Sequence, residues 1–138
     1  MKKNLFFATL GLAIVLFASS CSKSDSISPP SPPPGGTSPQ GKWVGNHNSG
    51  IGGPLFYFEL NLNANSMIEV RANSDVTPDI ATGTWSLVAD SVRATYTFAG
   101  STTYSLAGKY STSSKIMNGT IGLGTNTAGA GVFSVTKQ

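Results

Sequence analysis

Hydrophobic and polar residues alternate along most of the chain after residue 40. Between Phe56 and Leu62, for example, Phe and Leu occupy the even positions, while Tyr, Glu and Asn occupy the odd ones. Comparable runs recur around residues 43, 68, 85, 96, 106, 121 and 133. A period of two places one side of an extended segment against a core and the other side in water. The pattern therefore predicts eight β-strands, each with one apolar face.

The segments between these runs are short and rich in turn-forming residues. Examples are Asn63-Ala64-Asn65, Asp90-Ser91 and Gly100-Ser101. Links of this kind join neighbouring strands as hairpins, and no apolar stripe with a 3.6-residue period follows residue 40. We therefore predict an all-β domain over residues 41–138, folded as an eight-stranded antiparallel up-and-down barrel. A β-sandwich is the alternative fold.

Residues 1–20 have the pattern of a secretory signal. Lys2 and Lys3 precede an apolar stretch from Leu5 to Ala18, and this order of charge and hydrophobicity is typical of export signals. As a helix, that stretch would extend about 21 Å, which is short of the ~30 Å apolar core of a bilayer. We therefore expect residues 1–20 to be a cleaved signal peptide rather than a permanent membrane span.

Cys21 is the single cysteine of the chain and ends the sequence Phe17-Ala18-Ser19-Ser20-Cys21. This ending resembles the lipobox of bacterial lipoproteins. The resemblance implies that the signal is cut before Cys21, that its thiol carries a diacylglyceryl group, and that the lipid anchors the protein in a membrane. Ser22 after Cys21 resembles the form sorted to the outer membrane of Gram-negative bacteria, on its periplasmic or its surface-exposed face.

Residues 21–40 have the composition of a linker. Six of the eight prolines fall there, among Ser, Gly and Thr. Proline fixes φ and lacks an amide donor, so this segment cannot join a sheet and favours extended conformations. We predict a lipidated, Pro/Ser-rich linker over residues 21–40 that separates the barrel from the membrane.

The barrel pattern itself has a recognisable beginning. Gly41-Lys42-Trp43 opens the first predicted strand, and an eight-stranded meander follows. This combination resembles the lipocalin-like and avidin-like (calycin) barrels, above all the small lipocalin-like domains of bacterial lipoproteins. The resemblance implies that Trp43 plugs one end of the barrel under a basic side chain of the last strand, for which Lys137 is the candidate. It also implies a ligand-binding interior.

Charge and candidate chemistry argue against several function classes. From Cys21 onward, seven Lys and Arg residues face six Asp and Glu residues, for a net charge of +1. These charges are scattered, whereas nucleic-acid binding requires a basic stripe. We therefore expect no nucleic-acid partner.

The few residues with catalytic or metal-binding chemistry stand apart from one another. His47 is the only histidine and lies in a Gly-rich segment that we expect to be a solvated loop. One His without Cys does not make a zinc site of the usual kind, and no nucleophile elbow is present. Glu59 and Glu69 fall on the outward phase of neighbouring strands, where they would serve solubility. We expect no enzyme activity, no catalytic residues, no metal and no cofactor.

The inward-facing aromatic residues leave two interpretations open. They could fill the barrel as a core, or they could line a cup that is open at one end. For a cup, the candidate ligand-pocket residues are Phe58, Trp85, Tyr96 and Tyr104, with the two Tyr hydroxyls orienting a ligand. Three glycines could leave room for it, namely Gly83, Gly108 and Gly119.

Two functions follow from these interpretations. The first is an envelope-anchored binding protein for a small apolar or amphipathic molecule. The alternative is a protein-interaction module, such as a small-barrel inhibitor of secreted hydrolases or an adhesion or scaffold domain. In that case the loops at Asn46–Gly53 and Asn73–Ile80 would contact the partner.

Overall fold

A computed structural model describes residues 38–50, 52–100 and 102–138 of the chain. The predicted signal peptide (residues 1–20), the predicted lipidation site Cys21 and most of the predicted linker (residues 21–40) lie outside the described residues. Among the residues described, no helix has the length and hydrophobicity needed to cross a membrane.

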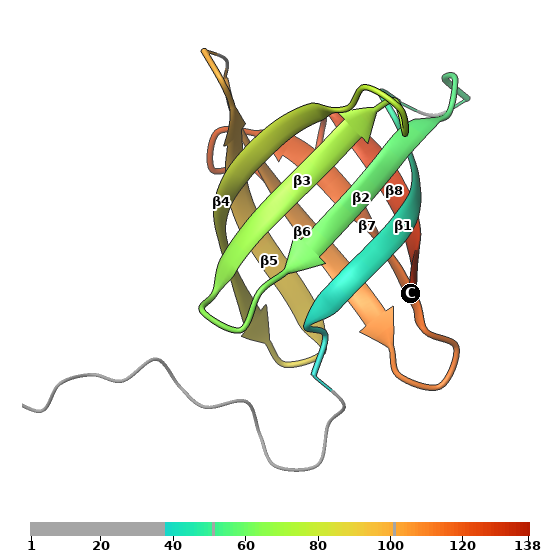
Figure 1. The fold of residues 1–138 in the computed structure, drawn as a ribbon, viewed down its shortest axis with the longest axis vertical. Helices are drawn as coiled ribbons and strands as arrows, with labels where there is room; N and C mark the ends of the chain where they lie inside the picture. Colours follow the sequence, from blue (N-terminus) through green and yellow to red (C-terminus); the bar gives the residue numbers. More distant parts are fainter. Residues whose placement is uncertain (1–37, 51, 101) are drawn as a thin grey trace, which may run out of the picture. The chain divides into compact units, whose positions relative to one another are not determined.

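The described residues form eight strands and no helix. They are β1 (Gly41–Asn48), β2 (Phe56–Leu62), β3 (Met67–Asn73), β4 (Asp79–Val88), β5 (Ser91–Phe98), β6 (Thr103–Ser111), β7 (Ile116–Leu123) and β8 (Gly131–Lys137). Each strand pairs antiparallel with the next, and β8 returns to pair with β1, which closes the barrel (Figure 1). The predicted all-β up-and-down barrel is confirmed, and the alternative of a sandwich is wrong.

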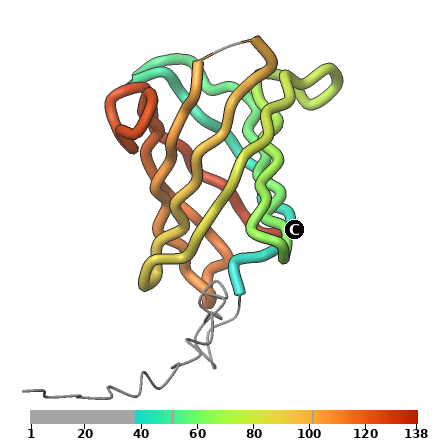
Figure 2. The backbone as a smooth tube through the Cα atoms, turned by 90° about the vertical axis from the view of Figure 1, so that its left-hand side faces the viewer, coloured from blue at the N-terminus to red at the C-terminus, as the bar shows by residue number. Residues whose placement is uncertain are grey.

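The barrel has two distinct ends, which we call upper and lower from their places in Figures 1 and 2. Odd-numbered strands run toward the upper end and even-numbered strands run back. The upper connections comprise residues 49–55, 74–78, 99–102 and 124–130, and the lower ones comprise residues 63–66, 89–90 and 112–115. The chain enters β1 at the lower end, where β8 also finishes (Figure 2).

The period-two alternation of the sequence puts its apolar phase inside the barrel. Leu60, Val70 and Leu106 are fully buried near the middle of their strands, which removes their side chains from water at a gain of about 1.5–3 kcal/mol each. Two polar residues are buried as well, Glu59 and Ser105. Both lie on the outward phase, so other parts of the molecule must cover them there.

The lower end is closed by Trp43 and the residues around it. The Trp43 side chain is 1% exposed, and its indole Nε1–H donates to the carbonyl oxygen of Pro39 at 2.7 Å. The Lys137 ammonium lies 5.6 Å from the centroid of the Trp43 ring and donates to the Ser38 carbonyl at 2.9 Å. Residues 38–40 therefore pack against the barrel, and Pro39 is itself buried.

The predicted space above Gly108 and Gly119 is occupied. A methyl group added at either glycine would come within 2.7 Å of the Phe133 ring, so this ring packs directly on both glycines. At Gly83 an added methyl would lie 1.9 Å from the Thr95 carbonyl oxygen of the neighbouring strand. These glycines therefore permit close packing of rings and strands, and the expectation that they leave room for a ligand is wrong.

Candidate functional site

A cavity of about 290 Å³ opens inside the upper end of the barrel. Its wall is largely aromatic and aliphatic, with hydroxyl, amide and imidazole groups but no Asp, Glu, Lys or Arg. The residues that matter for its chemistry are His47, Phe58, Asn73, Tyr96, Phe98 and Tyr104. At the lower end of the interior Trp43 and Met117 are fully buried, so the barrel is packed at one end and hollow at the other.

Two tyrosines dominate one wall of this cavity. Tyr96 of β5 and Tyr104 of β6 are directly paired across the two strands, and their rings stack with centroids 5.9 Å apart at an interplanar angle of 17°. Phe98 stands edge-on to both rings at 5.9 Å. Cross-strand neighbours on one face of a sheet approach closely enough for such contacts. The wall thus presents a flat aromatic surface with an edge beside it.

The hydroxyl groups of Tyr96 and Tyr104 have no hydrogen-bond partner within the described residues. This matters for Tyr96 in particular, because the residue is only 3% exposed and lines the cavity. Burial raises the pKa of Tyr96 well above its usual value, and the neighbouring Tyr104 raises it further. Tyr96 therefore stays protonated and can both donate and accept a hydrogen bond.

His47 is a cavity residue rather than a solvated loop residue, which corrects our expectation from the sequence. Strand β1 continues to Asn48, so His47 lies on the inward phase and packs against Phe58 at 5.1 Å and Phe56 at 5.7 Å between ring centroids. Its Nε2 atom is buried without a partner among the described residues. Burial lowers the pKa of His47, against the opposing effect of a side-chain hydrogen bond with Asn73. The imidazole is therefore neutral near pH 7.

Three of the four predicted pocket residues meet at this cavity, and the fourth does not. Phe58, Tyr96 and Tyr104 line it, whereas Trp85 lies at the lower end, where its Nε1–H donates to the Asn63 carbonyl at 2.9 Å. Strand direction explains the difference. Phe58 comes early in a descending strand, but Trp85 comes late in one, so the same inward phase places the two rings at opposite ends.

Sequence reasoning did not assign the other residues that line the cavity, among them His47, Asn73 and Phe98. They can be found from the position of a residue within its strand and the direction of that strand. Residues near the upper end come late in odd-numbered strands and early in even-numbered ones. Phe98 meets this criterion as the last residue of β5, and Asn73 as the last residue of β3. His47 would have required the correct end of β1.

A second hollow of about 380 Å³ adjoins the cavity at the upper rim. The two share Asn73, Phe98 and Tyr104, and the second is also bordered by Asp79. Asn73 Nδ2 donates to Asp79 Oδ2 at 2.5 Å. The carboxylate is thereby held beside the cavity without being part of its wall.

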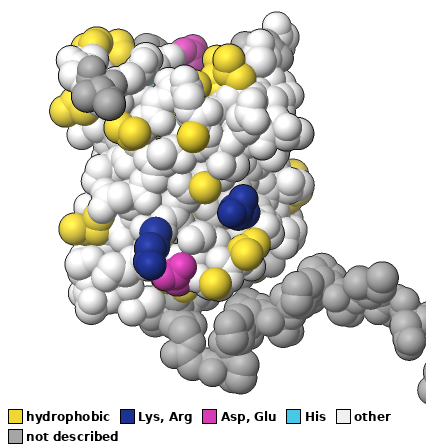
Figure 3. All heavy atoms as spheres, turned by 180° about the vertical axis from the view of Figure 1, so that it is seen from behind, with side chains coloured by type: hydrophobic (Ala, Val, Ile, Leu, Met, Phe, Trp, Pro, Cys, Tyr) yellow, Lys and Arg dark blue, Asp and Glu magenta, His cyan; other side chains and the backbone are white. Residues whose placement is uncertain are grey.

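The two expected recognition loops, Asn46–Gly53 and Asn73–Ile80, overlap two upper connections, but the ends of both ranges belong to strands β1, β3 and β4. Leu55 is 69% exposed in the first connection, and Val76 is 82% exposed in the second. Figure 3 shows hydrophobic side chains scattered from the upper to the lower end of the rear face, while the Lys and Arg side chains on that face lie in its lower half. Leu55 and Val76 therefore give the upper rim two exposed apolar side chains.

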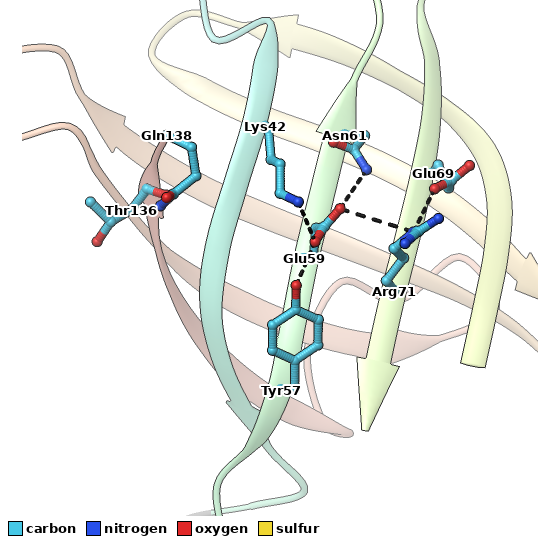
Figure 4. Close-up of polar contacts among 8 residues, drawn as sticks. All are labelled: Lys42, Tyr57, Glu59, Asn61, Glu69, Arg71, Thr136 and Gln138. Carbon is cyan, nitrogen blue, oxygen red and sulfur yellow. Dashed lines mark hydrogen bonds and ion pairs between the residues drawn. The ribbon is translucent and has the colours of Figure 1, made fainter. Parts of the chain in front are cut away.

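A separate polar cluster lies on the outer face of β1, β2 and β3 (Figure 4). Glu59 is 3% exposed there; it accepts hydrogen bonds from Tyr57 and from Asn61 Nδ2 at 2.8 Å, and its Oε2 lies 2.9 Å from the Lys42 ammonium. Burial tends to raise the pKa of Glu59, but the hydrogen bonds from Tyr57, Lys42 and Asn61 outweigh it and the pKa is lowered. Conversely, burial and this carboxylate raise the pKa of Tyr57 to about 12.

Glu59 thus serves the packing of the outer face, and solubility does not account for it. Arg71 Nε lies 2.9 Å from Glu69 and 4.0 Å from Glu59, so the two carboxylates are bridged by a cation. They do not flank a cavity, as the paired carboxylates of a glycosidase would. Within the described residues, no three His, Cys, Asp or Glu side chains are grouped so that they could hold a metal ion.

Comparisons with known proteins identify no relative: no family model, no curated protein and no solved structure matches this chain. The class that the fold defines is an all-β protein built on a closed eight-stranded antiparallel barrel.

Proposed function

We propose that the barrel binds a small apolar or amphipathic molecule in its upper cavity. The observation that carries this proposal is the Tyr96 hydroxyl, which lies on an apolar cavity in a nearly fully buried side chain and has no hydrogen-bond partner within the described residues. On the same cavity wall, His47 Nε2 is buried without a partner among the described residues, and leaving such an atom unpaired costs about 1–3 kcal/mol. A bound molecule could form hydrogen bonds with the Tyr96 hydroxyl and with His47 Nε2.

The size of the cavity sets the size of the ligand. Its volume of about 290 Å³ is at the lower limit of typical small-molecule sites, which begin near 300 Å³. At ~30 Å³ for each water-sized group, about ten non-hydrogen atoms fit. The proposed ligand is therefore a compact one- or two-ring molecule, and a long acyl chain would extend beyond the mouth.

Binding rather than catalysis is the proposed role. The polar groups on the cavity wall are hydroxyls, one amide and one neutral imidazole, and no carboxylate or cation of the described residues joins them on that wall. General acid–base chemistry requires a group whose proton affinity is matched to the reaction and positioned by a partner. The wall is instead suited to hold and orient a ligand.

The test of binding is a fragment screen by NMR on the barrel, followed by titration of each hit. We expect Tyr96→Phe to weaken binding of hydroxyl- or amine-bearing fragments by about five- to tenfold, since it removes one hydrogen bond and keeps the ring. Thr97→Val is the matched control, because it removes a hydroxyl from the outer face one residue further along β5. Fragments that shift only residues outside the cavity would contradict the proposal.

We further propose that the protein is a lipoprotein of the Gram-negative outer membrane, anchored through Cys21. The sequence before and after Cys21 supports this. Within the described residues, the chain enters the barrel at the lower end and the cavity lies at the upper end.

The anchor is tested by Cys21→Ala in a Gram-negative host. Membrane fractionation should find the wild-type protein in the outer-membrane pellet and the variant in the soluble fraction, with the barrel folded in both. Ser22→Ala is the control, because it leaves the proposed lipidated thiol in place. A variant that still sediments with the membrane would rule the anchor out.

A second candidate function is recognition of a protein by the rim, which the exposed side chains of Leu55 and Val76 favour. The partner could be a secreted hydrolase or an adhesion or scaffold protein. Changing both residues to Ser should abolish such an interaction without reducing fragment binding in the cavity, because neither residue lines it. Loss of fragment binding in this double variant would show that the rim and the cavity are a single site.

A further inference from the structure

We infer that the ligand is a small aromatic amine, with its ring in the upper cavity and its ammonium group in the adjoining hollow beside Asp79. This inference rests on the proposed binding function and narrows the chemical class of the ligand. Three features carry it: the aromatic, uncharged cavity wall, the carboxylate next to that wall, and the distribution of charge at the upper end of the barrel.

The cavity wall favours a ligand whose inserted part is flat and uncharged. The stacked rings of Tyr96 and Tyr104 and the edge of Phe98 offer the offset and edge-on geometries that aromatic rings prefer. A charge buried among them would lack a partner of opposite sign, because the wall contains no Asp, Glu, Lys or Arg, and an unpaired buried charge is costly. Any charged group of the ligand must therefore lie outside the cavity.

The adjoining hollow offers a place for a positive charge. Asp79 borders it, makes no ion pair among the described residues, and is oriented by the amide of Asn73. Phe98 and Tyr104 also border it, and the faces of aromatic rings attract cations within about 6 Å. Because both residues belong to the cavity as well, a side chain of a few atoms joins an indole-sized ring in the cavity to a cation in the hollow.

The distribution of charged residues along the barrel favours a bound cation at the upper end. The four upper connections contain no Lys or Arg, and Asp75 lies in one of them. Arg71, which pairs with Ile80 in the register of β3 and β4, is ion-paired with Glu69. Lysines concentrate at the lower end, at positions 42, 109, 115 and 137. The upper mouth therefore attracts cations and repels carboxylates.

The test compares three probes that share one ring and differ in charge: tryptamine (a cation), 3-methylindole (neutral) and indole-3-acetate (an anion). Titration calorimetry on the barrel at pH 7 and low salt should find tryptamine bound about three- to tenfold more tightly than 3-methylindole, because it adds an exposed ion pair and a cation–π contact. Indole-3-acetate should bind more weakly than 3-methylindole. Raising the salt to 0.5 M should reduce these differences.

Asp79→Asn should remove the advantage of tryptamine and leave the affinity for 3-methylindole unchanged. This substitution keeps an oxygen that can accept from Asn73 and lies at an exposed site, so the fold is retained. Asp90→Asn, at the lower end, is the matched control and should change none of the three affinities. An anion bound as tightly as the amine, or an Asp79→Asn variant that keeps the preference, would overturn the inference.

The outcomes also separate this inference from the proposed function. If 3-methylindole binds in the cavity but charge has no effect, the aromatic-amine assignment fails and the binding function stands. If none of the three probes binds, both fail.

Discussion

Glu59 lies on the outer face of the barrel but is buried, which is unusual for a carboxylate on an outer face. Its neighbours on the outer surface cover it so that the residue is only 3% exposed, and both of its carboxylate oxygens are paired with Tyr57, Asn61 and Lys42. A buried charge is tolerated only when it is paired and hydrogen-bonded. The outer face of β1 and β2 is therefore held together by polar contacts, in the same way that apolar contacts hold the inner face.

We expect Glu59→Gln to lower the free energy of unfolding at pH 7 by about 1–3 kcal/mol, because Lys42 and Tyr57 lose a charged acceptor. The folded pKa of Glu59 lies below its ordinary value of 4.5, so its contribution is present above pH 4.5 and is lost as the pH falls below it. Urea unfolding of wild type and variant should therefore differ at pH 7 and converge as the pH falls through the lowered pKa of Glu59. Glu69→Gln, at an exposed carboxylate, should have a small effect at both pH values.

His47 illustrates where residue-level reasoning from the sequence stops. Its inward phase follows from Trp43 by alternation, since both occupy odd positions of one strand. What the local sequence does not reveal is that β1 extends through Asn46 and His47, where Asn and Gly neighbours favour a turn. Pairing with both β2 and β8 stabilises the extended conformation there, and that pairing exists only once the barrel is closed.

At the scale of strands, alternation predicted the existence, number and phase of all eight, because each has one side in the core. It did not predict how the last upper connection folds. Ser105 is buried on the outward phase because its hydroxyl donates to the Gly124 carbonyl at 2.5 Å, and Thr120 holds the Thr127 carbonyl in the same connection. Residues 124–130 thus fold over the outside of β6 and β7. The fold of this connection could not be predicted from the sequence, because it depends on contacts between segments that are distant along the chain.

The contact between β4 and β5 at Gly83 depends on the absence of a side chain. We expect Gly83→Ala to destabilise the barrel by about 1–3 kcal/mol or more, because the added methyl would overlap the Thr95 carbonyl oxygen and push the two strands apart. Thermal unfolding followed by circular dichroism measures this. Gly53→Ala is the matched control, since a methyl there meets nothing closer than 3.4 Å; an equal loss in both variants would refute the steric explanation.

At the scale of the molecule, the barrel begins before its first strand. The Pro39 carbonyl is the hydrogen-bond acceptor of Trp43, and the Ser38 carbonyl accepts from Lys137. Composition alone assigns these residues to the linker, because Pro and Ser dominate residues 21–40. Their role in the fold depends on the closed lower end and so could not be read from local sequence.

Two truncated proteins test this boundary. A protein that starts at Ser38 should unfold cooperatively with a β-type dichroism spectrum, whereas one that starts at Gly41 should be less stable by about 1–3 kcal/mol, since the Trp43 Nε1–H loses its buried partner. Denaturant titration monitored by tryptophan fluorescence gives both values. Equal stabilities would show that residues 38–40 add nothing to the barrel.

The beginning of β1 and the end of the chain meet at the lower end of the barrel, where the Gln138 backbone amide donates to the Lys42 carbonyl at 2.9 Å. Since β1 and β8 are also paired, the eight strands form a closed ring, and the fold does not require the chain termini to lie between β8 and β1. A short peptide joining Gln138 to Ser38 would complete the ring covalently, and a new break in an exposed upper turn, such as the one at Val76, would preserve every pair of neighbouring strands. Circular permutation is therefore available to this protein, and it would place the new termini at the upper end of the barrel, beside the cavity.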